Sequence, residues 1–339
     1  MRAALAAAAQ SGRTVRPNPR VGCAILTATG EVIAAHHQKF GGPHAEVEAL
    51  TEVRRRGLSS QGATVAVSLE PCCHQGKTPP CTEALKQAGV ARVLVAVRDP
   101  FPRVSGKGIE ALLQGGIEVV EGLGSVEAES LNREWLYSQR RGLPFVTLKM
   151  ATSLDGLWTA SSGESRWITG PSARDKGHEL RARADAIVTS LKTVQIDNPE
   201  LTARNSEGKL RPHQPRVFVL SRKGEPDLSP YKVSRHPGWA KGIQLDDLEG
   251  FLRRLHGEGH HDVLVEAGPG LATAFLNGGF VAELWLFMGP RLLGGAGARL
   301  GALANGRLPG VEWEILDVQR FSEGDLLVRA MPRPSVSPA

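Results

Sequence analysis

The sequence feature that most constrains this chain is a histidine–glutamate pair followed by two cysteines. His44 and Glu46 come first, and Cys72 and Cys81 follow in a loop rich in Gly, Thr and Pro. Imidazole and thiolate are common protein ligands of zinc, and a catalytic zinc takes three of them and leaves its fourth tetrahedral position open for water. His44, Cys72 and Cys81 are therefore predicted to hold one zinc ion, and the fold must bring them to one point.

Glu46 is predicted to carry protons at this site. Zinc lowers the pKa of a bound water from about 15.7 to about 7, and the water's proton still needs an acceptor. A carboxylate two residues beyond a ligand can take that proton and pass it to a leaving amine. His-x-Glu followed by Pro-Cys-x-x-Cys is typical of zinc-dependent nucleobase deaminases. The pattern therefore predicts hydrolytic removal of an amino group from a heterocycle.

One spacing departs from that pattern, because eight residues rather than two separate Cys72 from Cys81. Three other interpretations stay open on the residues alone. The two cysteines could be ordinary buried thiols, since free cysteine behaves as a small hydrophobe. A nucleic-acid base deaminase would share the His-x-Glu pair but would leave residues 145–330 without a purpose. A non-catalytic zinc scaffold would fill the fourth position with another ligand, for which His74 is the candidate.

The length of 339 residues exceeds what one hydrophobic core usually supports, so two domains are expected. Basic residues, a glycine and a proline stand together in the run 140–144, and such residues end a helix. We place the domain boundary in this run. Residues 1–143 and 144–332 are the two predicted domains, and residues 333–339 are a Pro/Ser-rich tail expected to be disordered.

The net charge of +6 and the pI near 9.3 fit a phosphate-bearing partner, either nucleic acid or a phosphorylated metabolite. Aromatic residues make up only 5%, and no basic stretch is interleaved with them, which argues against nucleic acid. Four cysteines, two of them assigned to zinc, form no disulfide framework, so a reducing cytoplasm is expected. The Ala-rich stretch 3–9 is interpreted as a helix, and no membrane partner is expected.

Hydrophobic periodicity predicts an α/β architecture in both halves. His44 is expected in the first turn of its helix, where the helix N-terminus favours negative charge. The expected strands are 21–26, 31–35, 63–69, 93–97, 145–150, 217–220 and 262–266, and the expected helices are 44–56, 82–88 and 125–139. The first two strands are joined by a turn at 27–30, as in a hairpin.

Glycines follow one of the strands of the second half, at 268 and 270. Between a strand and a helix, such glycines let backbone amides approach a pyrophosphate. The dinucleotide-binding fingerprint itself is absent, because its third glycine would fall at Thr273. The glycine cluster at 294–297 is a weaker signal that fits a flexible turn equally well.

Several segments closely resemble the bifunctional riboflavin-biosynthesis deaminase-reductase family, in which the longer spacing between the two cysteines is usual. In the first half they are 17–23 (PNPRVGC), 42–47 (GPHAEV) and 69–81 (LEPCCHQGKTPPC), and in the second half 145–156, 163–170 and 193–204. The resemblance covers nearly the whole chain. It implies a cytidine-deaminase-like N-terminal domain and a dihydrofolate-reductase-like C-terminal domain.

The resemblance also implies two reactions. The first is zinc-dependent deamination of 2,5-diamino-6-(5-phosphoribosylamino)pyrimidin-4(3H)-one, and the second is reduction of its ribosyl group to ribityl by NADPH. Nicotinamide supplies the hydride, so the protein has only to hold it against the acceptor carbon. The expected cofactors are Zn²⁺ and NADPH, the expected partner is a small phosphorylated pyrimidine, and a homo-oligomer is expected.

By the same resemblance, Asn18 orients the pyrimidine in the first site. The cofactor residues of the second would be Thr152, Trp167, Thr193, Asp197, Ser221, Arg222, Gly268 and Gly270. Its substrate residues would be Ser165, Arg181, Leu201, Arg204 and Glu266, with the arginines binding phosphate through bidentate guanidinium groups. Lys149 and Asp155 are candidates for the reduction step. Each has a structural alternative: Trp167 in the core, Arg181 on a solvated helix face, Asp155 closing a turn.

Two positions depart from the family. Phe101 stands where the family usually has an asparagine associated with the sugar-phosphate. Ala282 stands where it often has an acid, and we interpret this position as structural and outside the site.

Overall fold

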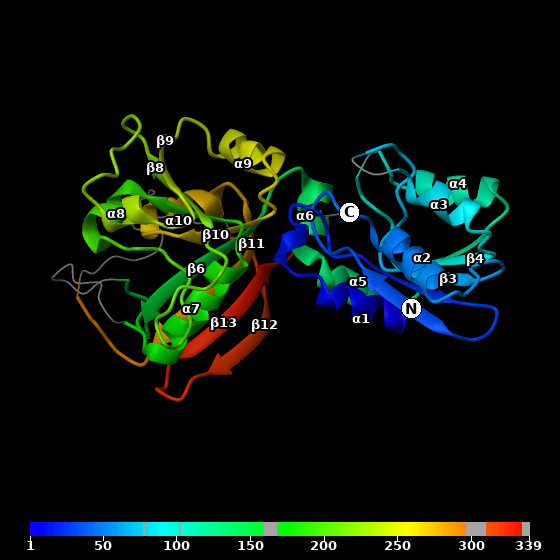
Figure 1. Cartoon of the computed structure of the whole chain (residues 1–339). Coiled ribbons are helices and arrows are strands. Elements are labelled where there is room, and N and C mark those ends of the chain that lie inside the picture. Colours follow the sequence, from blue (N-terminus) through cyan, green and yellow to red (C-terminus); the bar gives the residue numbers. More distant parts are fainter. Residues whose placement is uncertain (77–78, 102, 159–167, 296–309, 334–339) are drawn as a thin grey trace. The chain divides into compact units, whose positions relative to one another are not determined.

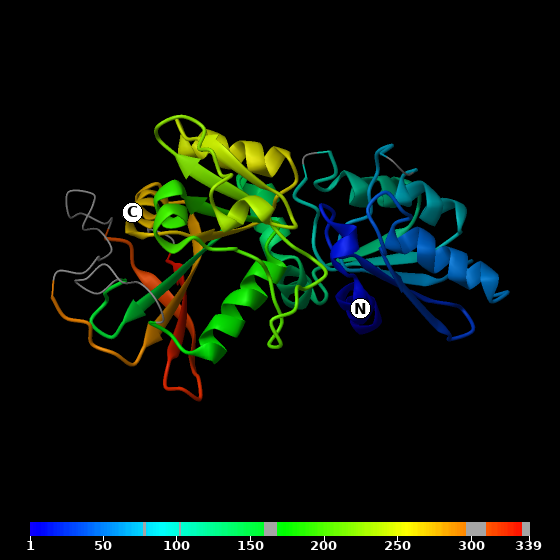
Figure 2. The ribbon, with the colours of Figure 1, turned by 60° about the vertical axis from the view of Figure 1, so that its left-hand side comes forward.

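The computed structural model describes residues 1–76, 79–101, 103–158, 168–295 and 310–333. The chain divides into two compact units, Met1–Gly142 and Leu143–Ala339, and each has its own sheet (Figures 1 and 2). Among the described residues, no helix has both the length and the apolar character needed to cross a bilayer.

The first unit is built on a five-stranded sheet with the order β2-β1-β3-β4-β5. Its strands are β1 (Gly22–Leu26), β2 (Val32–His36), β3 (Thr64–Val67), β4 (Arg92–Val95) and β5 (Glu118–Glu121). β1 runs antiparallel to β2 and β3, while β3, β4 and β5 are parallel. The predicted hairpin is confirmed, since Leu26 lies opposite Val32 and the turn between them closes on Thr27.

Helices cover both faces of this sheet because successive strand residues point to opposite sides. Cys23 and Ile25 of β1 pack against Leu50 of α2, whereas Ala24 between them packs against Ala4 of α1. The helices of the unit are α1 (Arg2–Gln10), α2 (Ala45–Arg55), α3 (Cys81–Gln87), α4 (Lys107–Gln114), α5 (Ser125–Leu131) and α6 (Arg133–Arg141). Neither α4 nor β5 is among the elements expected from the sequence.

The single helix predicted at 125–139 is wrong, because the chain breaks at Asn132 into α5 and α6. Asn132 has φ −120° and ψ 23°, outside the helical region. Its buried side chain is hydrogen-bonded to the main chain of Arg20. A tertiary contact that no helical periodicity reveals therefore accompanies the break.

The second unit is built on an eight-stranded sheet with the order β12-β13-β11-β6-β10-β7-β8-β9. Its strands are β6 (Phe145–Ser153), β7 (Ala186–Ser190), β8 (Arg216–Ser221), β9 (Ala240–Gln244), β10 (Asp262–Glu266), β11 (Val281–Gly289), β12 (Trp313–Arg320) and β13 (Leu326–Pro332). The six strands from β11 to β9 are parallel, and β13 and β12 extend the sheet in antiparallel pairing. The carboxyl ends of the parallel strands therefore meet at one edge, where such sheets bind ligands.

Helices also cover both faces of the second sheet. Phe218 and Val265 face a core shared with α9 and α10, while Val217 and Leu264 face a core shared with α7 and α8. The helices are α7 (Pro171–Arg183), α8 (Leu191–Asp197), α9 (Leu248–Gly257) and α10 (Pro269–Asn277).

Ala282 lies at a register shift in the pairing of β11 with β6 and is buried. The next residue, Glu283, has a side chain only 1% exposed and lies 2.6 Å from the Arg329 guanidinium. That guanidinium also lies over the Trp285 ring, 4.8 Å from its centroid. These contacts support the interpretation of Ala282 as a structural position.

Candidate metal centre and reductase site

The predicted zinc ligands converge in the first unit. The Nδ1 atom of His44 lies 3.5 Å from the Cys72 Sγ and 3.3 Å from the Cys81 Sγ, and the three ligand atoms lie within 4.8 Å of one another. Zn–N and Zn–S bonds of about 2.0 and 2.3 Å at a tetrahedral angle place N and S about 3.5 Å apart. The three side chains therefore fit one tetrahedral zinc ion.

The protonation of the two thiols supports the same assignment. Hydrogen bonds from Cys81 and His44 hold the pKa of Cys72 down to about 4 despite burial, while the Cys72 sulfur and burial raise the pKa of Cys81. The two sulfurs therefore lie close enough for a negative charge on one to oppose ionisation of the other. Two thiolates at this distance need a cation between them, and zinc binds thiolates.

Two of the three predicted ligands lie at the start of a helix, and the third lies in a loop. His44 caps the N-terminus of α2 rather than lying in its first turn as expected, and Cys81 is the first residue of α3. Cys72 follows β3 in the connecting loop, and the backbone N–H of Cys81 donates to its sulfur at 3.4 Å.

Glu46 lies in the first turn of α2 and is only 3% exposed. Its Oε2 atom is buried and has no hydrogen-bond partner among the described residues. Burial raises the pKa of this carboxyl, with the Cys72 charge as a second cause. A buried carboxyl with an unsatisfied oxygen beside the ligand set matches the predicted proton carrier.

His37 is a residue of this site that sequence reasoning missed. It is 2% exposed, and its ring meets the His44 ring edge-on with centroids 5.5 Å apart. Its Nδ1 lies 2.8 Å from the Pro43 carbonyl, which can only accept, so Nδ1 carries the hydrogen and Nε2 is the acceptor. The Asn18 Nδ2 therefore donates to Nε2 at 3.2 Å, which fixes the orientation of the Asn18 amide. Burial lowers the pKa of His37, which favours this neutral form.

Glu70 is a second residue that the sequence did not single out. It is 4% exposed and stands two residues before the ligand Cys72. Its carboxylate accepts four backbone N–H groups at 2.9–3.2 Å. Those of Asp99 and Gly106 belong to the loop after β4, and those of Gly108 and Ile109 to the first turn of α4, which follows this loop. Glu70 therefore ties this loop to the cysteine segment.

The residue that departs from the family, Phe101, lies on that loop and is 37% exposed. Its ring centroid is 6.4 Å from that of His74, and its N–H donates to the Asp99 carboxylate at 2.8 Å. Burial is the main cause that raises the pKa of Asp99 to about 7. Here an aromatic ring takes the place of the family's usual amide.

The predicted cofactor residues lie along the carboxyl edge of the second sheet. Thr152 and Ser221 lie at the ends of β6 and β8, and Arg222 follows Ser221 at the surface. The Thr193 hydroxyl accepts the N–H of Gly268 at 3.0 Å, which joins the segments after β7 and β10. Gly268 caps α10, Gly270 lies in its first turn, and Asp197 ends α8. A Cβ at Gly268 would meet only the Thr193 hydroxyl, 3.7 Å away, so there is space beside the N-terminus of α10, and helix N-termini of this kind can bind a phosphate group.

Two predicted substrate residues form a buried pair. The Arg181 guanidinium donates to both oxygens of Glu266, at 2.6 and 3.0 Å, and to the Thr202 carbonyl at 3.1 Å. Burial alone would raise the pKa of Glu266, but the charge and hydrogen bonds of Arg181 bring it down to about 2. Lys149 lies 4.0 Å from Glu266, and burial lowers the pKa of its ammonium group.

Two more of the predicted substrate residues, Leu201 and Arg204, lie on the loop after α8. Leu201 is 3% exposed and has φ +55°, a left-handed conformation that is uncommon for leucine. Arg204 donates to the Thr202 hydroxyl, the Gly208 carbonyl and the Glu200 carboxylate. Strained backbone of this kind tends to occur at functional sites.

Three further candidates remain. Ser165 and Trp167 lie outside the described residues. The carboxylate of Asp155 accepts the N–H groups of Leu293 and Gly294 and the Ser153 hydroxyl, and these bonds bring its pKa down to about 2. Asp155 therefore joins the turn after β6 to residues 293 and 294.

The two folds and their sites define a zinc-dependent deaminase joined to a reductase. The family model for the cytidine and deoxycytidylate deaminase zinc-binding region matches residues 1–97, and that for the RibD C-terminal domain matches residues 144–327. The riboflavin biosynthesis protein RibD of Escherichia coli K12 is 40% identical and covers 92% of this chain and 91% of its own. The Mycobacterium tuberculosis protein of the same name is 42% identical over 83% of this chain and 81% of its own.

Solved structures give the same result over nearly the full length. Acinetobacter baumannii RibD is 35% identical with a TM-score of 0.84, covering 98% of this chain and 97% of that one. The Thermotoga maritima diaminohydroxyphosphoribosylaminopyrimidine deaminase/5-amino-6-(5-phosphoribosylamino)uracil reductase is 32% identical with a TM-score of 0.82 and the same coverage. The chain therefore belongs to the RibD family. The predicted family, fold class, zinc-dependent deaminase and NADPH-dependent reductase are confirmed.

Proposed function

We propose that this protein deaminates 2,5-diamino-6-(5-phosphoribosylamino)pyrimidin-4(3H)-one and then reduces the ribosyl group of the product to ribityl with NADPH. The observation that carries the proposal is the convergence of His44, Cys72 and Cys81 beside the buried carboxyl of Glu46. The similarity to the T. maritima enzyme, whose name contains both activities, supports the two reactions together.

In the first reaction, Glu46 moves the protons. Zinc, when bound by the three ligands, lowers the pKa of a water molecule and so makes it a nucleophile. Glu46 would take a proton from that water and deliver it to the amino nitrogen of the pyrimidine. The hydroxide oxygen would bond to the amino-bearing ring carbon, the bond from that carbon to the amino nitrogen would break as ammonia leaves, and the hydroxyl proton would pass to a ring nitrogen. Water supplies the oxygen of the new carbonyl. Asn18, held by His37, presents its Oδ1 to a donor of the ring.

In the second reaction, the nicotinamide supplies a hydride to the ribosyl carbon. Thr152, Thr193, Asp197, Ser221, Arg222, Gly268 and Gly270, with Trp167, are proposed to hold the dinucleotide. Arg181, Leu201, Arg204 and Glu266, with Ser165, are proposed to hold the substrate. Lys149 lies beside Glu266 and is proposed to serve the reduction step.

The proposal is tested by incubating the purified protein separately with the pyrimidinone substrate, cytidine and tRNA. Ammonia release from the pyrimidinone alone, followed by NADPH oxidation, is expected. Deamination of tRNA or cytidine with no reaction of the pyrimidinone would favour a nucleic-acid or nucleoside deaminase instead.

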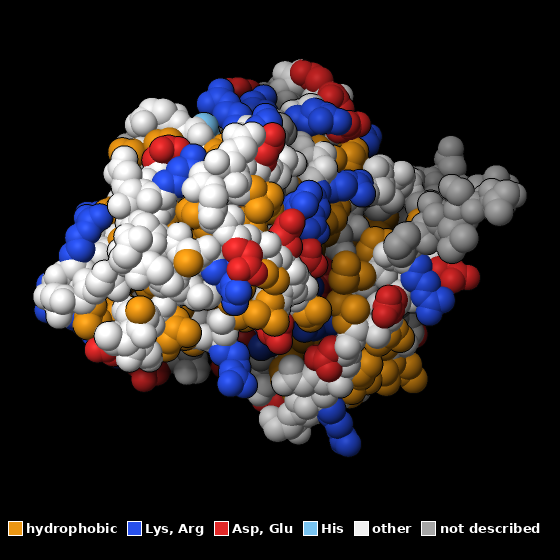
Figure 3. Space-filling model, turned by 90° about the vertical axis from the view of Figure 1, so that its right-hand side faces the viewer, with side chains coloured by type: hydrophobic (Ala, Val, Ile, Leu, Met, Phe, Trp, Pro, Cys, Tyr) orange, Lys and Arg blue, Asp and Glu red, His pale blue; other side chains and the backbone are white. Residues whose placement is uncertain are grey.

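Surface charge gives no support to a nucleic-acid substrate. On the face shown in Figure 3, basic and acidic side chains are interspersed and do not form one basic surface. Many cations of the first unit are paired with acids, such as Arg92 with Glu118 and Arg98 with Glu121. Nucleic-acid binders instead gather basic residues on one face.

Arg222→Ala is expected to raise the Kd for NADPH about 10- to 100-fold and that for NADH much less. Arg222 follows the end of β8, where a cation can bind the 2′-phosphate that only NADPH carries. A charge-assisted hydrogen bond contributes about 1.5–3 kcal/mol, which corresponds to this range. Both Kd values can be measured by nucleotide fluorescence titration. Lys241→Ala, which removes one exposed cation from within β9, is the matched control. Equal losses for NADPH and NADH would contradict the assignment.

We also propose that the chain forms a homo-oligomer in a reducing cytoplasm. In the edge strand β12, the exposed fractions of Ile315, Leu316 and Val318 are 63, 41 and 57%. Exposed apolar edge strands are prone to pair with another chain. All four cysteines are free. Sedimentation of purified protein is expected to give a multiple of the chain mass, and a monomer at all concentrations would contradict this.

A further inference from the structure

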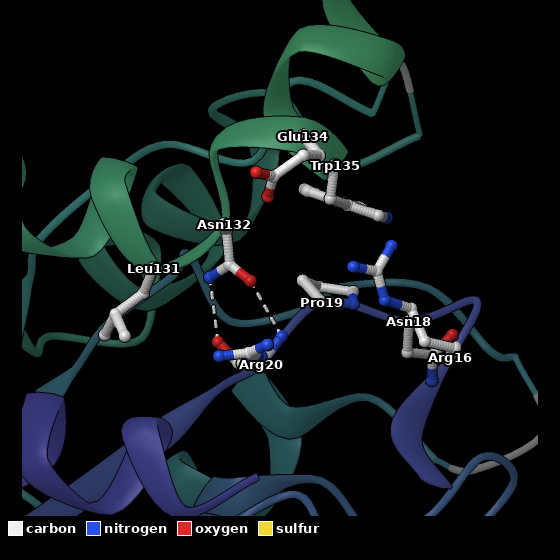
Figure 4. Close-up of a pocket in the computed structure, with 8 residues that line it drawn as sticks. All are labelled: Arg16, Asn18, Pro19, Arg20, Leu131, Asn132, Glu134 and Trp135. Atoms are coloured by element: carbon white, nitrogen blue, oxygen red, sulfur yellow. Dashed lines mark hydrogen bonds between the residues drawn. The ribbon is translucent and has the colours of Figure 1, made fainter. Parts of the chain in front are cut away.

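Asn132 holds the segment that carries Asn18. Its Oδ1 accepts the N–H of Arg20 at 2.8 Å, and its Nδ2 donates to the carbonyl of Arg20 at 2.8 Å (Figure 4). The two residues are 112 positions apart, and Asn132 is 4% exposed. A side-chain amide with one donor and one acceptor side by side can bond both main-chain groups of one residue, as a neighbouring strand would.

Asn132 is attached to a helix that packs in the core of the first unit. Asn132 directly precedes α6, whose Trp135 and Leu136 are buried against Leu69 and Val97. Leu69 comes just before the segment that carries Glu70 and Cys72. The two hydrogen bonds of Asn132 therefore connect the Arg20 main chain to packed side chains next to the zinc-ligand segment.

The Arg20 main chain, to which Asn132 is bonded, belongs to the loop before β1. Asn18 stands two residues before Arg20, and Pro19 lies between them on the wall of the pocket in Figure 4. His37 fixes the side-chain amide of Asn18, while Asn132 fixes the main chain that follows it. Both contacts are needed to fix the position and direction of the Asn18 side-chain amide, since a displacement of about 1 Å is enough to weaken catalysis strongly.

We propose that Asn132 is a positioning residue for deamination, which acts through the Arg20 main chain to place Asn18 against the pyrimidine. This inference rests on the proposed role of Asn18 in the first reaction. It adds to the site a residue that touches neither zinc nor substrate.

The test is a double-mutant cycle on deamination with Asn18→Ala, Asn132→Leu and the combined variant. Asn132→Leu keeps nearly the same shape and removes both hydrogen bonds. We expect each single variant to lower kcat/KM for deamination at least about tenfold, mainly through KM. The combined variant is expected to be no worse than Asn18→Ala alone, because Asn132 acts only through Asn18.

Three measurements separate this role from general destabilisation. Zinc content should stay at one per chain, reduction of supplied deaminated intermediate should be unchanged, and the melting temperature shows whether the variant is folded. Ser60→Ala is the matched control, because it removes a side-chain bond to the Ala88 carbonyl in the same unit, away from residues 16–20. If Asn132→Leu does not fold, Asn132→Asp takes its place in the cycle, since it keeps the acceptor for the Arg20 N–H but sets a carboxylate against the carbonyl.

Each contrary outcome is decisive. Multiplied losses in the combined variant would overturn the inference, because they would show that Asn132 acts independently of Asn18. Normal kcat/KM in Asn132→Leu with a defective Asn18→Ala would overturn it and leave the proposed function intact. A normal Asn18→Ala would overturn both the inference and the role of Asn18. No ammonia release from the pyrimidinone by the unmodified protein would be a failure of the proposed function itself.

Discussion

Glu46→Gln is expected to lower the rate of deamination by about two to four orders of magnitude, the usual contribution of a general acid/base. Glutamine keeps the shape of the side chain but cannot take a proton from water and deliver it to the amine. Glu46 is buried with one unsatisfied oxygen, so this oxygen is available to accept the proton. Ammonia release under saturating substrate measures the effect.

The control for this variant is the metal. Glu46 is not a proposed ligand, so Glu46→Gln should retain one zinc per chain by elemental analysis, whereas Cys72→Ser and Cys81→Ser should lose both zinc and deamination. Reduction of supplied deaminated intermediate should continue in all three, because the described reductase residues lie in the second unit. Retained deamination in Glu46→Gln would place the proton carrier elsewhere, and undiminished zinc in both serine variants would refute the ligand set.

Arg181→Met is expected to abolish reduction and to destabilise the second unit by about 3–5 kcal/mol, the usual cost of leaving one charge of a buried pair uncompensated. The side chains of Arg181 and Glu266 are only 19 and 10% exposed, and their contact is bidentate. Denaturant unfolding and NADPH oxidation measure the two effects, and deamination should be unaffected.

The Arg181–Glu266 pair also predicts how the stability of the second unit changes with pH. Arg181 lowers the pKa of Glu266 to about 2, below its value in the unfolded chain, so the stabilisation is complete above the unfolded pKa. It is lost as the pH falls towards 2. In Arg181→Met the pKa of Glu266 should rise, so that this variant loses less stability on acidification than the unmodified protein.

A second variant separates folding from binding. Arg181→Met combined with Glu266→Met removes both charges of the bidentate pair and should recover part of the lost stability. The recovery should be incomplete, because Lys149 loses the carboxylate that lies 4.0 Å from it. Reduction should stay absent, since the side chains proposed to hold the substrate are gone. Recovered reduction in the combined variant would show that the pair is only structural.

The sequence was sufficient for the features that local chemistry determines. The residue types of His44, Glu46, Cys72 and Cys81 and their order identify a zinc site with a proton carrier, whatever the exact fold, because zinc chemistry needs those groups. β-branched runs likewise predicted β10 at Asp262–Glu266, since a buried parallel strand is apolar on both faces.

Long-range contacts decided what the sequence could not. The amphipathic pattern of 125–139 predicted one helix. The helix is interrupted at Asn132, whose side chain is hydrogen-bonded to the main chain of Arg20, 112 residues away. Glu70 was indistinguishable from a surface acid until four N–H groups of residues 99–109 were seen to converge on it. Arg181 and Glu266 are 85 residues apart, and only the placement of α7 beside β10 makes them a pair.

The difference has a physical reason. A helix period, a strand run or a metal motif is written in residues that are neighbours along the chain. A hydrogen bond between distant segments depends on where the packed core places each backbone, and many sequences with the same local pattern would place them differently. The sequence by itself therefore determined the chemistry of the first site. The tertiary structure alone decided which groups hold Asn18 and Cys72 in the first site and Glu266 in the second.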